Sequence, residues 1–129
     1  MRLEKSWGAW RVDFRPDFTL MESGLDFFVN WNKDCIGKDA ALDEKKNGPS
    51  KHLSVIEIET ETDVSGDEAV MHNGKCVGYV TSGGYGHSVG KSLAMTYLPV
   101  ELIDEDTELE VEIFGKFHQA SVVMKPLYE

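Results

Sequence analysis

Residues 108–113 read Glu-Leu-Glu-Val-Glu-Ile, a strict alternation of charged and apolar side chains. Successive side chains of a β-strand point to opposite faces, so this period of two is typical of a strand with one buried face and one wet face. The segment 119–124 follows after a turn at Gly115-Lys116, and we expect it to pair antiparallel with the first. The C-terminal quarter of the chain therefore predicts an antiparallel sheet.

Further strands are expected around the strongest hairpin signal in the chain, which is Asn73-Gly74. This dipeptide favours a tight two-residue turn, and the segments 69–71 and 76–81 flank it as antiparallel partners. Apolar residues also favour strands over 53–59 and 91–98. Short strands with one apolar face can bury it only by closing on each other, so we predict a small antiparallel β-barrel or sandwich, mainly β with a short helix.

The first 50 residues give three more expectations. The opening MRLEKSW is interpreted as the end of a helix, because a helical pattern starts without an N-cap residue. Leu25, Phe27, Val29 and Trp31 recur at every second position and predict a strand. Residues 37–46 predict a short helix that ends at Gly48-Pro49.

Composition excludes several classes of function. The chain has 129 residues, enough for one core, and a formal net charge of -10, which repels nucleic acid and anionic lipid surfaces. No apolar run is long enough for a membrane span or a signal peptide, so we expect a soluble intracellular protein. Two cysteines and four histidines stand singly, without the spacing of metal ligands.

The segment from Gly83 to Ser92 superficially resembles a phosphate-binding loop. Its glycines are wrongly spaced for that motif, and a strand pattern follows instead of a helix, so we interpret it as a glycine-rich connection between two strands. The acidic run 104–106 is interpreted as a solvated loop, because the spacing of a calcium loop is absent. No catalytic constellation is found. Trp7, Trp10, Phe27 and Trp31 are expected to pack in the core, with a ligand-stacking surface as the alternative.

Three segments resemble, in order and spacing, the signatures of the glycine cleavage T-protein superfamily. These are Arg2-Leu3-Glu4, Thr19–Leu25 and Ile36–Leu42, and the later segments 77–84 and 90–99 resemble the C-terminal barrel of that family. The sequences of residues 4–6 and 22–26 resemble dimethylglycine and sarcosine dehydrogenases more than the stand-alone T-protein.

The resemblance implies a barrel of the aminomethyltransferase C-terminal type over residues 37–129, preceded over 1–36 by the end of a helix of the folate-binding domain and a connecting segment. It implies tetrahydrofolate as cofactor, an N-methyl amine as substrate and FAD in an N-terminal domain that lies upstream, together with the catalytic aspartate. Trp7 and Phe27 match family positions that touch folate, and Arg2 and Glu4 belong to the first signature. No catalytic or metal residue is assigned within the chain.

The expected function is therefore that of the C-terminal part of an enzyme that passes a one-carbon unit to tetrahydrofolate, located in the cytoplasm or, in a eukaryote, in the mitochondrial matrix. We expect the chain to be inactive alone, because the family's proton-transfer group precedes Met1. The alternative is a stand-alone barrel adaptor that binds a protein partner without catalysis.

Overall fold

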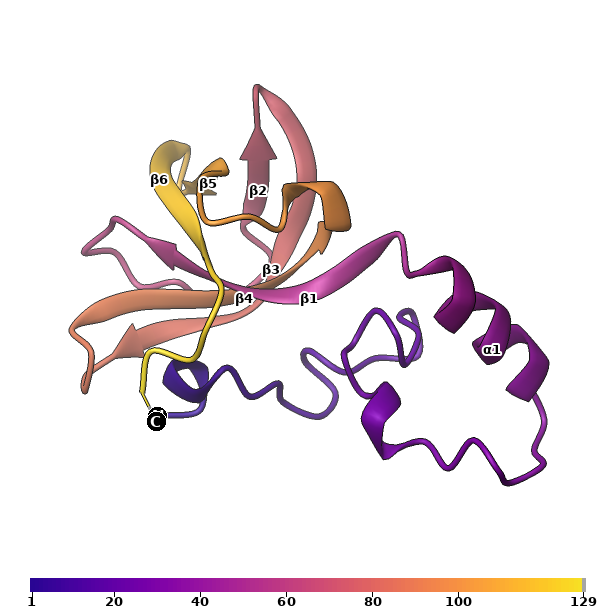
Figure 1. Ribbon diagram of the computed structural model, residues 1–129. Helices are drawn as coiled ribbons and strands as arrows, with labels where there is room; N and C mark the ends of the chain where they lie inside the picture. Colours follow the sequence, from indigo (N-terminus) through magenta and orange to yellow (C-terminus); the bar gives the residue numbers. More distant parts are fainter. Residues whose placement is uncertain (129) are drawn as a thin grey trace.

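A computed structural model describes residues 1–128. Figure 1 shows a barrel with an irregular N-terminal segment beneath it and a helical arm beside it. The elements, in chain order, are η1 (Leu3–Lys5), η2 (Asp26–Phe28), α1 (Lys38–Asn47), β1 (Lys51–Ile58), β2 (Ala69–His72), β3 (Lys75–Gly86), β4 (Lys91–Pro99), η3 (Val100–Leu102), β5 (Glu108–Ile113) and β6 (Lys116–Val123).

Within residues 1–128 the strands form a closed antiparallel barrel in the order β1-β4-β3-β2-β5-β6, and β1 pairs with both β4 and β6. The hairpin β2–β3 turns at Asn73-Gly74, as predicted, and β5–β6 turns at Phe114-Gly115, one residue before the predicted Gly115-Lys116. All four turn residues have positive φ. A two-residue turn with both residues at positive φ matches the twist of the strands that it joins. The predicted fold class, a small antiparallel barrel with one short helix, is confirmed.

The barrel interior is apolar. Leu109, Val111 and Ile113 of β5 are buried, whereas Glu108 and Glu112 on the opposite face are exposed and Glu110 is half-buried, as their alternation predicts. They join side chains from the other strands, among them Ile56, Val70, Val80, Leu98 and Val122, in one cluster. This cluster stabilises the barrel, since burying such side chains contributes roughly 1.5–3 kcal/mol each.

The predicted strand over residues 25–31 is wrong. Residues 26–28 form the 3₁₀ turn η2, and Phe27 and Phe28 are largely exposed. The physical reason is that the closed barrel has no free edge with which another strand could pair. Alternating apolar residues without a partner strand do not form a sheet.

The predicted connection at 83–92 is also only partly right. Gly83, Gly84 and Gly86 belong to β3 itself, and the turn to β4 is confined to 87–90. An added Cβ at Gly83 would lie 2.7 Å from the carbonyl oxygen of Val64, so glycine is required there by close approach of another backbone.

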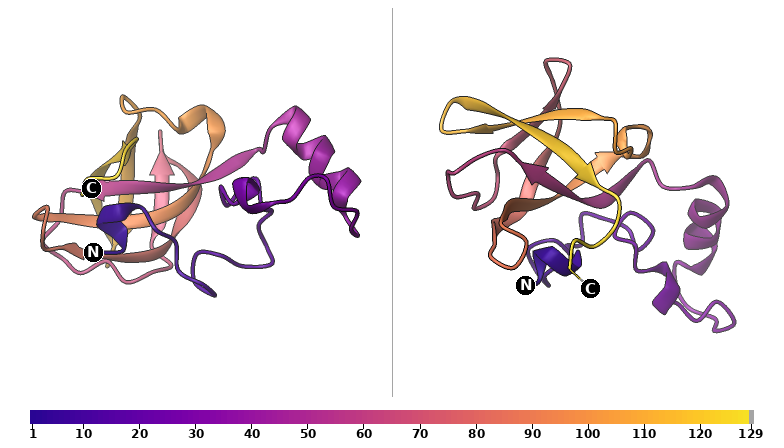
Figure 2. Two further views of the ribbon diagram at one scale, coloured as in Figure 1. Left: turned by 60° about the horizontal axis from the view of Figure 1, so that its bottom comes forward. Right: turned by 60° about the vertical axis from the view of Figure 1, so that its left-hand side comes forward.

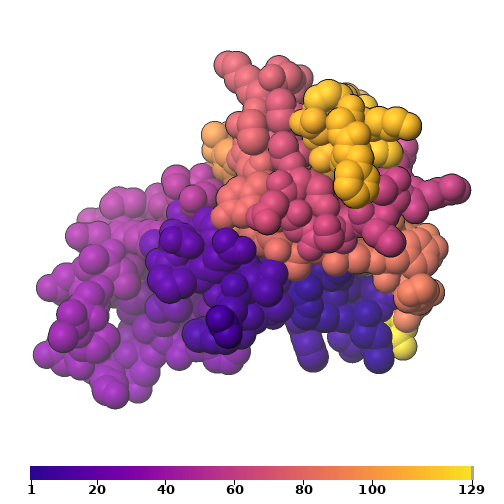
Figure 3. Space-filling view, turned by 180° about the vertical axis from the view of Figure 1, so that it is seen from behind, coloured from indigo at the N-terminus to yellow at the C-terminus, as the bar shows by residue number. Residues whose placement is uncertain are grey.

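The N-terminal segment lies against one end of the barrel, and its start lies close to the C-terminus (Figure 2). The N–H of Tyr128 donates to the carbonyl of Glu4 at 3.1 Å. Seen from behind, residues 1–25 form a continuous layer under β3 and β4 (Figure 3). The helix α1, predicted from the sequence, stands beside the barrel, and none of its residues is buried.

Candidate functional site

The first signature segment is a compact turn that presents Trp7. Ser6 adopts a left-handed conformation with φ of 57°, its N–H donates to Leu3 O, and the Trp7 N–H donates to Arg2 O at 3.0 Å. This pair of bonds is the Schellman arrangement that ends helices. Where the sequence predicts the end of a helix, the structure has a three-residue 3₁₀ helix, Leu3–Lys5, with this C-terminal cap. The Trp7 side chain follows directly and is 65% exposed.

The second signature segment, Thr19–Leu25, is also one structural unit. The Thr19 N–H donates to Glu22 Oε2 at 3.0 Å, and the Glu22 N–H donates to Thr19 Oγ1 at 3.1 Å, which is a capping box. Gly24, with φ of 66°, ends the turn, and the Leu25 N–H donates to Leu20 O at 2.9 Å. The Leu53 N–H of β1 donates to Glu22 O at 2.7 Å. The unit is thus fixed to the barrel and places Phe27 just beyond its end.

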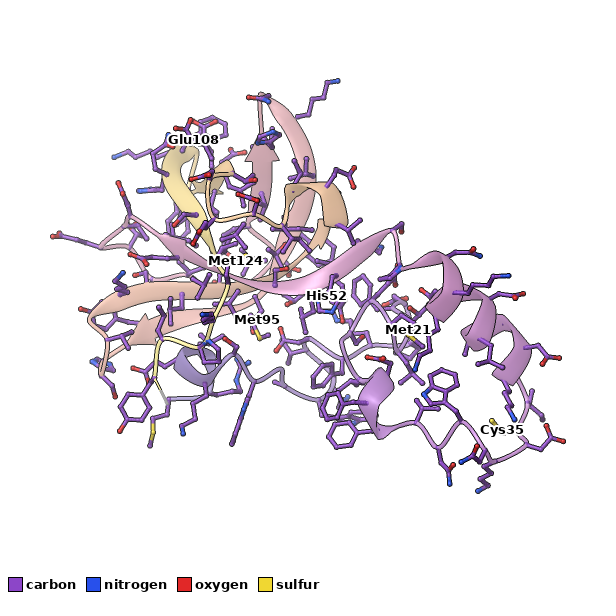
Figure 4. The ribbon with its side chains drawn as sticks, in the orientation of Figure 1. Met21, Cys35, His52, Met95, Glu108 and Met124 are labelled. Carbon is purple, nitrogen blue, oxygen red and sulfur yellow. The ribbon has the colours of Figure 1, made fainter. Side chains whose placement is uncertain are left out.

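A groove of about 730 Å³ lies between these two turns and the barrel. Trp7 and Phe27 both line it, together with Phe28, His52 of β1 and Met95 of β4. Figure 4 shows His52 and Met95 on the side of the barrel that faces the N-terminal segment. Met124, which follows β6, also lines the groove. A neighbouring hollow of about 590 Å³ is lined by Trp10 and shares Phe14, Ser23 and Leu25 with the groove.

The core interpretation of the aromatic cluster is wrong for three of its four members. Trp7, Trp10 and Phe27 are 65%, 80% and 73% exposed, and the ring of Phe27 lies 4.1 Å from that of Phe28. Trp31 is half-buried, with the Lys45 ammonium 4.4 Å from its ring centroid. Exposed aromatic rings of this size are typical of binding surfaces. Trp7 and Phe27 meet at one groove although they are 20 positions apart in sequence.

Arg2 and Glu4 point elsewhere. Arg2 donates from Nη1 to Trp7 O at 2.9 Å and to Asp13 Oδ2 at 3.0 Å, so it holds the main chain at the groove. Glu4 is buried and accepts from the Ser88 N–H at 2.7 Å. The ammonium group of Met1 lies 2.7 Å from Glu4 Oε2. Its hydrogen bond to the carboxylate is the main cause of a lowered pKa of Glu4, and burial acts in the opposite direction. Neither side chain lines the groove.

Sequence reasoning missed Asp13, which is fully buried at the centre of a hydrogen-bond network. Its carboxylate accepts from Arg2, from the Ala9 N–H at 2.7 Å, and from the hydroxyls of Thr81 and Ser82 on β3. The Tyr97 hydroxyl donates to the main-chain oxygen of Asp13 at 2.9 Å. Asp13 lies in an irregular segment without any periodic pattern, so the sequence offered no signal for it.

Over residues 1–128, no group of three or more histidine, cysteine, aspartate or glutamate side chains is arranged to hold a metal ion. Cys35 and Cys76 are both free thiols on the surface. None of the helices described in that range is long and apolar enough to cross a membrane.

Comparison with known proteins places this fold in a class. Residues 51–129 match the family model described as the glycine cleavage T-protein C-terminal barrel domain. The crystal structure of glycine cleavage system aminomethyltransferase T from Bartonella henselae superposes with a TM-score of 0.89 at 32% identity, covering 99% of this chain and 37% of that one. The fold is thus that of the C-terminal part of an aminomethyltransferase.

Two relatives refine the comparison. Dimethylglycine dehydrogenase, mitochondrial, from Homo sapiens is 40% identical over 130 residues, which cover 98% of this chain and 15% of the human protein. Aminomethyltransferase from Synechocystis is 35% identical over 130 residues, 99% of this chain and 35% of that protein. The chain belongs to the glycine cleavage T-protein family, as its signatures indicated, and it spans only about a sixth to a third of the length of these relatives.

Proposed function

We propose that this chain supplies one wall of a tetrahydrofolate site in an aminomethyltransferase unit, as part of an FAD-dependent dimethylglycine or sarcosine dehydrogenase. The observation that carries the proposal is that Trp7 and Phe27 line one groove and are both largely exposed. Flat aromatic faces on an open groove favour stacking with the pterin or aminobenzoyl ring of a folate. Bound tetrahydrofolate supplies the nitrogen atoms that accept a one-carbon unit.

The residues of the groove fit such a ligand. Its volume of about 730 Å³ lies within the range of small-molecule sites, and its lining is mostly apolar. Among the polar side chains on it, His52 holds its Nδ1 against Leu53 O at 2.9 Å and Ser23 is bonded to the Tyr97 hydroxyl at 2.9 Å. The carbonyl can only accept, so His52 Nδ1 carries a proton in this bond.

The roles of the four signature residues differ in this proposal. Trp7 and Phe27 contact the folate rings, whereas Arg2 and Glu4 fix the turn that carries Trp7. Residues 1–36 contain the end of a helix of the folate-binding domain and a connecting segment, and residues 37–129 form the barrel domain. FAD and the N-methyl amine bind to other parts of the enzyme, which acts in the cytoplasm or, as the name of the human relative states for that protein, in mitochondria.

The test is a calorimetric titration of the natural full-length protein with reduced folate. We expect Trp7→Ala and Phe27→Ala each to raise the dissociation constant about tenfold or more, because a lost stacking contact costs roughly 0.5–1.5 kcal/mol beyond the lost apolar area. Phe114→Ala is the matched control, since Phe114 is 91% exposed on the turn between β5 and β6 and lies outside the groove.

Equal affinity of the wild type, the two groove variants and the control would refute the folate site at this groove. A protein that binds no folate, but is retained by a partner protein through the same two side chains, would instead support the adaptor function.

A further inference from the structure

The carboxylate of Asp13 is buried under the N-terminal segment and is matched by donors from two parts of the chain. Arg2 and Ala9 donate from that segment, at 3.0 and 2.7 Å, and Thr81 and Ser82 donate from β3, the latter at 2.8 Å. Removing a charge from water costs several kcal/mol unless hydrogen bonds compensate it. Four donors around one carboxylate therefore fix the segment on the barrel in one position.

The same network reaches the main chain of Trp7. Arg2 donates from Nη1 both to Asp13 Oδ2 and to Trp7 O, and from Nη2 to Ser82 Oγ at 3.1 Å. A planar guanidinium gives these bonds a fixed relative direction. The Trp7 carbonyl is thus tied to Asp13 through one rigid group.

The Trp7 indole is weakly held by its surroundings. It is 65% exposed, and the Lys5 ammonium lies 5.8 Å from its ring centroid, a weak contact at an exposed site. The position of the ring on the groove therefore depends on how firmly its backbone is anchored.

We propose that Asp13 is a positioning residue of the groove: through Arg2 it holds Trp7 in the place where the ring meets the ligand. The proposal rests on the proposed folate function for its consequence in binding. It concerns the orientation of Trp7 itself, which is measurable without folate. The main apolar cluster of the barrel contains none of Arg2, Asp13 and Trp7, so the network and the core are separable by mutation.

The first experiment uses ¹⁹F NMR of the 129-residue chain labelled with 5-fluorotryptophan, with the Trp7 resonance assigned by Trp7→Phe. We expect Asp13→Asn to shift and broaden the Trp7 resonance and to leave that of Trp31 unchanged, because Trp31 packs on Lys45 far along the sequence. Val111→Ala, a core truncation on β5, is the control for a general loss of stability and leaves the Trp7 resonance in place. Arg2→Lys, which cannot form the same fork, reproduces the effect if Asp13→Asn fails to fold.

The second experiment is a double-mutant cycle in the full-length protein, with affinity for reduced folate as the readout. We expect Asp13→Asn to weaken binding about tenfold in the wild-type background and to have no further effect in the Trp7→Ala background. An unchanged Trp7 resonance, or an equal loss of affinity in both backgrounds, overturns the positioning role. If Asp13→Asn shifts and broadens the Trp7 resonance as expected, but Trp7→Ala does not weaken folate binding, the proposed function is overturned. The positioning of Trp7 by Asp13 then still stands.

Discussion

Gly24 shows how a single residue can be required by backbone geometry and by space at once. Its φ is 66°, and an added Cβ would lie 3.2 Å from Cε1 and Nε2 of His52. We expect Gly24→Ala to destabilise the chain by about 1–2 kcal/mol through the left-handed conformation alone, and by more through the contact with His52. Urea unfolding measures the loss. Gly37→Ala is the control, because Gly37 has φ of 83° with nothing within 4 Å, and an equal loss in both variants would exclude the contribution of His52.

Tyr97 links the N-terminal segment to β4 through a buried hydroxyl. Burial raises the pKa of Tyr97, against the opposing effect of its hydrogen bond with Ser23. A raised pKa means that the folded state favours the neutral phenol. The resulting stabilisation is present below about pH 10, the ordinary value, and is lost as pH rises through the folded-state pKa. We expect the free energy of unfolding of Tyr97→Phe to decrease less steeply above pH 10 than that of the wild type, as measured by urea unfolding. Tyr85→Phe, which changes a half-exposed ring, should show the same decrease as the wild type.

At the scale of the element, the glycines of β3 allow other segments of the main chain to lie close to the strand. Gly83→Ala is expected to destabilise the barrel by about 2 kcal/mol or more, because its Cβ would lie 2.5 Å from Val64 Cγ1 and 2.7 Å from Val64 O. Gly84→Ala should cost less than about 1 kcal/mol, since its nearest contact is Leu3 Cδ1 at 3.5 Å. Thermal unfolding of the two variants decides this, and a similar loss in both would show that the close approach of Val64 does not matter.

The same element explains why its glycines do not make a phosphate site. Residues 83–86 are paired with β4 from Ala94 to Lys91, so their backbone groups are engaged in the sheet. The spacing of the glycines had already argued against nucleotide binding. The structure adds a reason for Gly83, which is close packing on the loop that contains Val64, and for Gly86, where an added Cβ would lie 3.0 Å from Glu4 Cγ and from Val89 Cγ2.

At the scale of the whole molecule, the groove is open to solvent, since Trp7 and Phe27 on its lining are largely exposed. We expect the 129-residue chain to bind reduced folate at least about tenfold more weakly than the full-length protein, because a small-molecule site buries most of its ligand and needs walls on all sides. Calorimetric titration of both proteins tests this. Equally tight binding by the short chain would mean that the groove is a complete site.

The sequence by itself determined the barrel strands, because alternation, the Asn73-Gly74 turn and apolar runs are local signals that the pairing then satisfied. It also indicated the family, through the resemblance of Thr19–Leu25 and the other signature segments to the glycine cleavage T-protein superfamily. Only the tertiary structure decided the state of residues 25–31, because closure of β1 onto β6 removed every edge that a further strand needs.

The candidate site, too, was determined partly by the sequence and partly by the tertiary structure. The residue types at Trp7 and Phe27 were visible in the sequence, but their meeting at one groove depends on the anchoring of two turns to the barrel. Asp13 acquires its importance only through Arg2, Thr81 and Ser82, which lie 11, 68 and 69 positions away. Contacts over such separations leave no periodic trace in the chain, and only the packing of the N-terminal segment on the barrel brings these groups together.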